Sequence, residues 1–170
     1  TPAILLHHPS AVELVGKMLI DRTRQSLSFS RQMTFLEGDP GAVLFVEFYG
    51  ESETELMSKI KALKKDLARQ RLGYASVNLM DTASQANVWA IRRAGLGLLM
   101  SVRGDVKPIP FVEDPAVEPE KMGDFIRRFD QIIKSYDTQA GYYGHASVGC
   151  LHIRPLINLK SRKGIDTMVS

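Results

Sequence analysis

The sequence is poor in cysteine and in long apolar runs. Its single cysteine, Cys150, excludes an internal disulfide and is compatible with a reducing compartment. No apolar stretch approaches the roughly 18 residues that a membrane-spanning helix needs, and the start, TPAILLHHPS, lacks the basic and then apolar pattern of a signal peptide. No GxGxxG, Walker, GxSxG or CxxC motif occurs. Any cofactor chemistry is therefore expected to come from outside this chain.

The sequence also carries little net charge. It has 22 Lys+Arg and 19 Asp+Glu, and therefore a formal charge of +3. Its basic residues are dispersed, and acidic residues stand among the aromatics of FVEFY (45–49). A surface that stacks bases needs cations beside its aromatics, because phosphate binding is electrostatic. Nucleic acid is therefore not an expected partner.

The composition that is present is typical of a globular domain. Hydrophobic residues make up 44% and charged residues 24% of the chain, close to the average for such domains. A chain of 170 residues is long enough to bury most of its apolar surface without disulfides. Because the sequence begins with Thr1 and not with methionine, residues 1–170 are expected to be one domain cut from a longer protein.

Two capping-box spacings predict helix starts in the first half of the chain. Ser10 followed by Glu13 predicts a helix from about residue 11, and Ser52 followed by Glu55 predicts a second helix. The apolar stripe of the second helix consists of Leu56, Ile60, Leu63 and Leu67. Between the two helices, the β-branched and aromatic run AVLFVEFYG (42–50) predicts a strand.

The second half alternates predicted strands and helices. YASVNLM (74–80) and PIPFVED (108–114) predict strands, and a helix is expected from residue 81 or 82 to about residue 94, where Gly95 and Gly97 follow.

The C-terminal third adds another helix, which begins near Pro119, and the segment AGYYGHASVGCLHIRPL (140–156), which predicts two short strands around a glycine-rich turn. The resulting order of elements favours an α+β fold of the ferredoxin-like kind. In such a fold an antiparallel sheet carries amphipathic helices on one face.

Two histidines form the most informative candidate site. His145 and His152 are seven residues apart, a spacing that a strand–turn–strand can bring to one point. Two imidazoles so placed can hold a divalent metal such as Zn²⁺, with the thiol of Cys150 as a third ligand. The alternatives are histidines hydrogen-bonded to the backbone and a cysteine that is only a small core residue.

A second candidate site is cationic. Arg92 and Arg93 lie near a predicted helix end, and Lys107 precedes a strand. They could clamp a carboxylate, although arginine at a helix C-terminus often only compensates the helix dipole. Glu113 and Asp114 could be paired carboxylates, but adjacent strand residues are expected to point to opposite faces.

Four motifs occur in order along the chain: Trp89-x-x-Arg92, Lys107, PFVED (110–114) with a following Val117, and GHASVGCLH (144–152). Together they resemble the C-terminal (cap) domain of FAD-linked oxidases, the group that contains D-lactate, glycolate and D-2-hydroxyglutarate dehydrogenases. The resemblance covers nearly the whole chain. HIRPLINLK (152–160) is most similar to a bacterial branch whose full-length proteins also carry an iron–sulfur region.

The resemblance implies a substrate domain packed over the FAD of a flavin-binding domain in the same polypeptide. By position, His145 and His152 bind a divalent metal, usually zinc, while Arg92 and Lys107 hold the carboxylate of a 2-hydroxy acid that loses hydride to the flavin. The family takes its third metal ligand and its catalytic histidine from a downstream segment. No catalytic residue is therefore expected within residues 1–170, and the isolated chain is expected to be inactive. The implied location is cytoplasmic, or peripheral to the inner membrane.

The chain departs from the family pattern at several positions. Leu96 replaces a hydroxyl residue that often contacts the carboxylate, and Ser147, Val148 and Cys150 replace polar members of the histidine block. Arg154 stands where asparagine is common. This larger cation predicts a more extended or more anionic substrate.

Two further interpretations remain open. A non-catalytic ferredoxin-like module that binds a small ligand or a partner predicts scattered cations, with His145 and His152 hydrogen-bonded inside the core. An RNA-binding sheet would need exposed aromatics flanked by cations. The substrate domain predicts that Arg92, Lys107, His145 and His152 converge on one concave surface.

Overall fold

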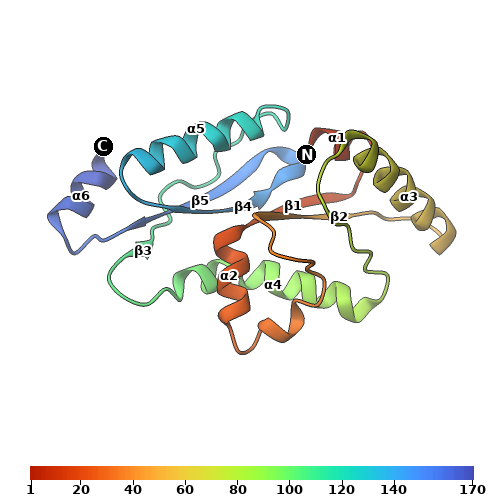
Figure 1. Cartoon of the computed structure of the whole chain (residues 1–170), viewed down its shortest axis with the longest axis horizontal. Helices are drawn as coiled ribbons and strands as arrows, with labels where there is room; N and C mark the ends of the chain where they lie inside the picture. Colours follow the sequence, from red (N-terminus) through yellow and green to blue (C-terminus); the bar gives the residue numbers. More distant parts are fainter.

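The computed structural model describes residues 1–170 as helices packed around a single sheet (Figure 1). The α-helices are α1 (Pro2–Leu5), α2 (Lys17–Gln25), α3 (Glu53–Gln70), α4 (Thr82–Met100), α5 (Met122–Ser135) and α6 (Arg162–Val169). The strands are β1 (Ala11–Gly16), β2 (Ala42–Glu47), β3 (Lys107–Pro108), β4 (Ala140–His145) and β5 (Cys150–Ile157). Two short 3₁₀ turns, Ser30–Gln32 and Ala146–Val148, complete the chain.

The five strands form one sheet in the order β2-β1-β4-β5-β3. Every neighbouring pair is antiparallel. The α+β class and the antiparallel sheet predicted from the sequence are therefore confirmed.

Helices cover both faces of the sheet, whereas the sequence predicted helices on one face. In Figure 1, α1, α3 and α5 lie above the sheet, and α2 and α4 lie below it. Strand β1 explains the second layer, because Val12 and Leu14 pack into one apolar cluster while Val15 packs into another. A strand that is apolar on both faces needs a cover on each side.

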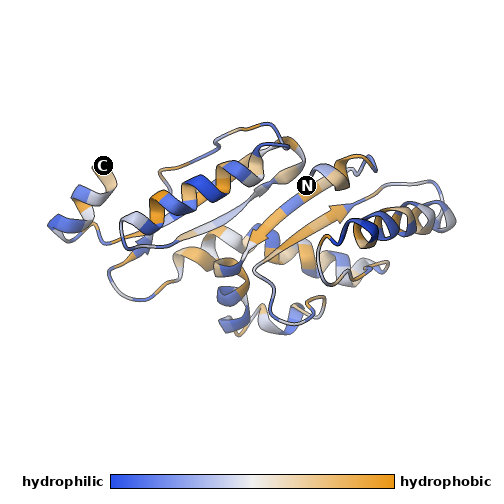
Figure 2. Ribbon diagram, turned by 45° about the horizontal axis from the view of Figure 1, so that its top comes forward, coloured by the Kyte–Doolittle hydropathy of each residue, from blue (hydrophilic) through white to orange (hydrophobic).

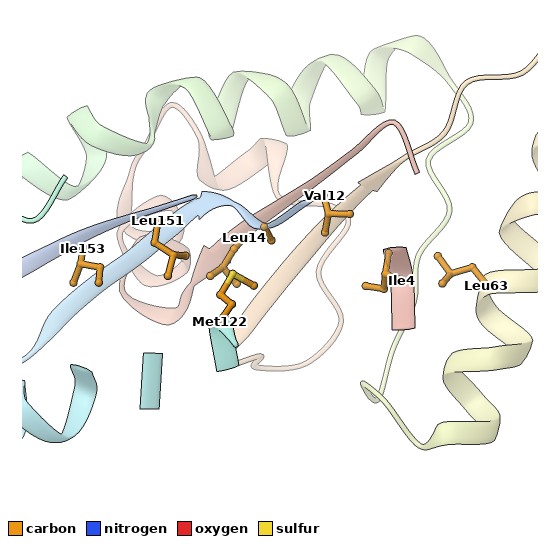
Figure 3. Packing of buried hydrophobic residues seen from close by; sticks show 8 residues of the cluster. Ile4, Val12, Leu14, Leu63, Met122, Leu151 and Ile153 are labelled. Carbon is orange, nitrogen blue, oxygen red and sulfur yellow. The ribbon is translucent and has the colours of Figure 1, made fainter. Parts of the chain in front are cut away.

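The upper cluster is the larger of the two. Figure 3 shows Val12 and Leu14 of β1 beside Leu151 and Ile153 of β5, with Met122 of α5 packed against them. The lower cluster joins β1 and β4 to α2 and α4; its buried members are Val15, Leu19, Ile20, Leu98, Leu99 and Tyr143. In Figure 2, β1 and β2 carry hydrophobic colour, whereas hydrophilic and hydrophobic colours alternate along α5, as is typical of an amphipathic helix.

The prediction of a helix beginning near Ser10 is wrong, because residues 11–16 form β1. Ser10 does not cap a helix. Its N–H donates to the carbonyl of Glu47 at 2.7 Å and its hydroxyl accepts from the N–H of Tyr49 at 3.1 Å. Glu13 does not cap a helix either, because its side chain projects below the sheet toward Arg92 and His145. The helix follows the strand and begins at Lys17.

The second capping box is confirmed. Ser52 precedes α3, and its hydroxyl accepts from the N–H of Glu55 at 3.2 Å. The predicted stripe faces inward, with Leu63 buried and Leu67 packed against the upper cluster. The strand predicted at 42–50 is confirmed as β2.

Three boundaries in the second half differ from the predictions. The strand predicted at 74–80 is wrong, because these residues are irregular and join no sheet; Lys64 of α3 donates to the carbonyl of Ser76. Helix α4 does not end at residue 94 but continues through Gly95 to Met100. Gly95 lets α2 pack closely against α4, because a Cβ there would lie 3.0 Å from a methyl of Leu19. The strand predicted at 108–114 shortens to β3 and one isolated bridge from Val112 to Ile153.

The remaining predictions near the C-terminus are confirmed. Helix α5 begins at Met122, slightly after Pro119, and 140–156 forms the paired strands β4 and β5. No helix in the structure is both long enough and apolar enough to cross a lipid bilayer.

Candidate functional site

Polar side chains of β1, β4 and β5 gather on the lower face of the sheet. Glu13 lies directly opposite His145, and Tyr143 lies directly opposite His152. Residues that face each other across an antiparallel pair project to the same side, as do residues two apart on one strand. Arg154 therefore projects to this side too. The register alone places five polar side chains beneath the sheet.

Glu13 connects an arginine to a histidine. The Nε of Arg92, which comes from α4, donates to Oε2 of Glu13 at 2.7 Å, and its Nη2 lies 2.6 Å from the same oxygen. The other oxygen, Oε1, lies 2.7 Å from Nδ1 of His145. Glu13 is only 7% exposed. A buried carboxylate of this kind needs charged partners, and Arg92 provides one.

Glu113 makes a second connection of the same type. Its Oε1 lies 2.6 Å from Nη2 of Arg154, and its Oε2 lies 3.1 Å from Nδ1 of His152. Burial acts to raise the pKa of the Glu113 carboxyl, but the hydrogen bonds from Arg154 and His152 outweigh it and hold this pKa below its ordinary value. The side chain of Glu113 is 42% exposed, so this connection is the more open of the two.

Asp114 joins the same group, contrary to the expectation that it would point away from Glu113. Its Oδ1 lies 3.0 Å from Nδ1 of His152. Residues 113 and 114 lie outside any strand, and Asp114 adopts a left-handed backbone with φ of 51°. The alternation that holds in a strand therefore does not apply, and both carboxylates face one imidazole.

Tyr143 separates the two arginines. The guanidinium carbons of Arg92 and Arg154 lie 5.4 and 5.3 Å from the centre of its ring, which are cation–π distances. Its hydroxyl accepts from Nη2 of Arg154 at 2.8 Å, and its ring centre lies 4.8 Å from that of His152. Burial raises the pKa of the Tyr143 hydroxyl. Tyr143 is thus a neutral spacer that keeps two like charges apart.

The two predicted metal ligands lie side by side. The ring centres of His145 and His152 are 5.6 Å apart. Each Nδ1 faces a carboxylate, Glu13 for one ring and Glu113 with Asp114 for the other. Metal-binding histidines commonly use this arrangement, in which one ring nitrogen donates to a carboxylate and the other binds the ion. The donor set fits a divalent metal held through the Nε2 atoms.

A second geometry is also available at His152. One ligand atom each of Glu113, Asp114 and His152 lies within 4.8 Å of the others. In that geometry the carboxylates would bind the ion directly and would not orient the histidine. Nitrogen and carboxylate ligands both suit Zn²⁺.

Of the two other candidate residues, Lys107 lies apart from the histidines, whereas Cys150 lies directly opposite His145 across β4 and β5. The ammonium of Lys107 donates to the carbonyl of Val102, close after the end of α4, and makes no ion pair with the cluster. The thiol of Cys150 lies 3.9 Å from Asp114, and burial raises its pKa.

The structure thus brings together Arg92, His145, His152 and Arg154, and adds residues that the sequence patterns did not indicate. Tyr143 was assigned no role, Glu13 was assigned only to a helix cap, and Glu113 was set aside. The signal for Glu13 was present, because a single acidic residue interrupts the apolar run Ala11–Gly16. An acidic residue in a buried strand usually has a charged partner.

Comparisons with known proteins were made for the whole chain. A family model described as "FAD linked oxidases, C-terminal domain" matches residues 2–169. A D-2-hydroxyglutarate dehydrogenase of Pseudomonas putida is 30% identical over 166 residues, which is 93% of this chain and 16% of that protein. The enzyme of the same name from Haemophilus influenzae is 30% identical over 175 residues, which is 96% of this chain and 17% of that protein. The chain therefore spans about a sixth of the length of these relatives.

Proposed function

Because the chain belongs to the family of C-terminal domains of FAD-linked oxidases, we propose that it is the substrate domain of an FAD-dependent enzyme that oxidises a 2-hydroxy acid. The observation that carries the proposal is the gathering of two arginines and two carboxylate-bound histidines on one face of the sheet. The relatives named D-2-hydroxyglutarate dehydrogenases favour a dicarboxylic hydroxy acid over lactate or glycolate.

The chain's own part is to bind and orient the acid. Arg92 on α4 is proposed to hold the 1-carboxylate, with Lys107 as the second cation that the family resemblance implies. Charge-assisted hydrogen bonds of this kind are stronger than neutral ones and fix orientation when the guanidinium binds with two N–H groups. In this structure Lys107 faces Val102, so its part requires the ammonium to turn toward the substrate.

His145 and His152 are proposed to hold the divalent metal, which when bound supplies Lewis-acid chemistry at the substrate hydroxyl. The charges of the cluster support a bound cation. Its carboxylates, Glu13, Glu113 and Asp114, outnumber its guanidinium groups, Arg92 and Arg154, by one. A cluster of net negative charge repels an organic acid, whereas a dication at the histidines reverses that sign.

The redox chemistry is proposed to belong to the flavin of the remaining polypeptide. An iron–sulfur cluster, if the full-length protein has one, needs several thiolate ligands, and Cys150 is the one cysteine of this chain. The cluster would therefore also be held elsewhere. The residue that accepts the substrate proton is likewise proposed to lie downstream of Ser170.

Anaerobic reduction of the flavin tests this proposal. The full-length protein is mixed with D- and L-2-hydroxy acids, and flavin absorbance is followed with and without a chelator. We expect one D-acid to bleach the flavin, and we expect chelation or His152→Ala to abolish the bleaching. The control is His8→Asn, at an exposed position whose left-handed backbone asparagine accommodates. Bleaching that persists in the presence of the chelator would contradict the proposed role of the metal. No bleaching by any acid would favour the ligand-binding module.

Arg154 is proposed to select a substrate with a second carboxylate. Its side chain is 3% exposed, and its Nε and Nη1 are buried without a hydrogen-bond partner. A carboxylate, that of Glu113, already lies on its Nη2, which shows that this edge of the guanidinium accepts one. An incoming substrate carboxylate would take the place of Glu113, whose side chain is 42% exposed and can turn toward solvent.

Replacing Arg154 with asparagine is therefore expected to change substrate preference. One charge-assisted bond contributes about 1.5–3 kcal/mol, so KM for a dicarboxylic 2-hydroxy acid should rise about 10- to 100-fold. KM for D-lactate or glycolate should change much less. Steady-state kinetics on the full-length enzyme measure both. An equal change for mono- and dicarboxylic acids would show that Arg154 acts only on the fold.

A further inference from the structure

We infer that Glu13 is a positioning residue that orients the carboxylate-binding arginine and the metal-binding histidine together. This inference rests on the proposed function, because it assigns Glu13 a part in the same site. Glu13 touches neither substrate nor metal in this assignment. It acts through Arg92 and His145, which are 79 and 132 residues away in the sequence.

The contacts of Glu13 divide cleanly between its two oxygens. Oε2 accepts from Nε of Arg92 at 2.7 Å and lies 2.6 Å from its Nη2, whereas Oε1 lies 2.7 Å from Nδ1 of His145. With one oxygen committed to each partner, a small rotation of the carboxylate moves both contacts at once. The two halves of the proposed site are therefore mechanically joined.

Strand pairing fixes Glu13 where it can do this. Its Cα lies directly across β1–β4 from that of His145, and its backbone sits between Val12 and Leu14, which are packed in the upper cluster. The carboxylate is consequently held by the sheet itself. Residues that support a site are most effective when they stand on rigid elements.

The contact with His145 decides which ring nitrogen is available. A carboxylate at Nδ1 accepts the proton of that nitrogen, so the lone pair resides on Nε2 and points away from Glu13. His145 is otherwise free to turn, because its side chain is 48% exposed. Without Glu13, neither the tautomer nor the ring orientation of this ligand would be fixed.

The contact with Arg92 decides which edge of the guanidinium is available. Nε donates to Glu13, whereas Nη2 lies 2.6 Å from the same oxygen but is buried without a hydrogen-bond partner. The edge formed by Nη1 and Nη2 is therefore left for a substrate carboxylate. Arginine side chains carry large rotamer freedom, and a fixed guanidinium loses less of it when the substrate binds.

A matched control exists elsewhere on the chain. Asp66 on α3 also receives one histidine and one arginine, His7 at 3.2 Å and Arg69, and its pKa is lowered to about 2 by the hydrogen bonds from Arg69 and His7. None of these three residues belongs to the candidate site. Loss of Asp66 therefore reports what removal of such a carboxylate does to the fold alone.

The test compares Glu13→Gln with Asp66→Asn in the full-length protein. Glutamine keeps the size of Glu13 but presents an N–H₂ group to one of two donors. We expect the affinity for Zn²⁺, measured by competition with a chromophoric chelator, to fall about 10- to 100-fold. We also expect KM for the 2-hydroxy acid to rise and kcat to fall. Asp66→Asn should leave all three values within about twofold.

Glu13→Asp keeps the test decisive if the glutamine variant does not fold. It retains the buried charge but is one methylene shorter, so it reaches Arg92 or His145 but not both. We expect it to fold and to show an intermediate loss of Zn²⁺ affinity or an intermediate rise in KM. Wild-type Zn²⁺ affinity, KM and kcat in a folded variant would overturn the role of Glu13. A wild-type protein that binds no Zn²⁺ and shows no flavin reduction by a hydroxy acid would instead overturn the proposed function.

Discussion

Replacing Arg92 with methionine in the full-length protein is expected to lower kcat/KM for the 2-hydroxy acid by about 10²- to 10⁴-fold. Two charge-assisted hydrogen bonds to the substrate carboxylate contribute about 1.5–3 kcal/mol each, and each 1.4 kcal/mol corresponds to about a tenfold change. Methionine keeps the length of the side chain and removes every donor. Steady-state kinetics with the preferred acid measure the loss.

Arg93→Met provides the control for this prediction. Arg93 is the next residue of α4, is exposed, and makes no ion pair. We expect kcat/KM of this variant to remain within about threefold of wild type, because an exposed charge in a high-dielectric environment contributes little. Similar losses in the two variants would mean that Arg92 acts through general charge and not through a specific contact.

Stability separates a substrate role of Arg92 from a structural one. Loss of Arg92 leaves the buried Glu13 with His145 as its only partner, and breaking such a pair typically costs about 3–5 kcal/mol. The kinetics are therefore measured at a temperature where circular dichroism shows both variants folded. A guanidinium salt that restores activity to an Arg92→Ala variant would locate the defect in the missing donor.

The predictions of the fold that were confirmed rest on patterns among residues close together in the sequence. The strand β2 and the helix α3 were predicted because their patterns depend on neighbours within one turn or one pleat, and the cap of Ser52 on the N–H of Glu55 is such a pattern. The same local rule failed at Ser10. There the N–H donates to Glu47 at the end of β2 and the hydroxyl accepts from Tyr49 just beyond it, and no local pattern indicates that such partners exist.

The site shows the same division. The residue patterns and the family resemblance indicated Arg92, His145 and His152, a departure from the family pattern indicated Arg154, and the fold places these four together. Their family roles remain predictions. The side chains that connect them were not predicted, because the contact of Glu13 with His145 spans 132 residues. It depends on a strand register that exists only after β1 has paired with β4.

Lys107 shows that a role cannot be transferred from the family to this chain by sequence position alone. The spacing from Arg92 to Lys107 is the fifteen residues that the family keeps, yet the ammonium donates to the carbonyl of Val102. A matching spacing fixes where a residue stands along the chain. The direction of a long, flexible side chain is set by the acceptors around it, and the substrate is one of those acceptors.

Replacing Gly149 with alanine is expected to lower the free energy of unfolding of residues 1–170 by about 2–5 kcal/mol. Gly149 begins the return from the 3₁₀ turn to β5 with φ of 70°, in the left-handed region that costs an alanine about 1–2 kcal/mol. A Cβ there would lie 1.7 Å from the carbonyl oxygen of Val117. That segment would have to move, and the hydrogen bond from the N–H of Val117 to the carbonyl of Gly149, 3.1 Å long, would be lost.

The same substitution at Gly97 should have the opposite sign. Gly97 lies within α4, and a methyl group added to it would meet no atom within 4 Å, while alanine is better than glycine in a helix by about 0.5–1 kcal/mol. Urea denaturation followed by circular dichroism measures both changes. Because the turn at Gly149 sets the distance between His145 and His152, we also expect Gly149→Ala, but not Gly97→Ala, to weaken Zn²⁺ binding. If the free energies of unfolding of the two variants differ by less than about 0.5 kcal/mol, the contacts of Gly149 with Val117 do not constrain the turn.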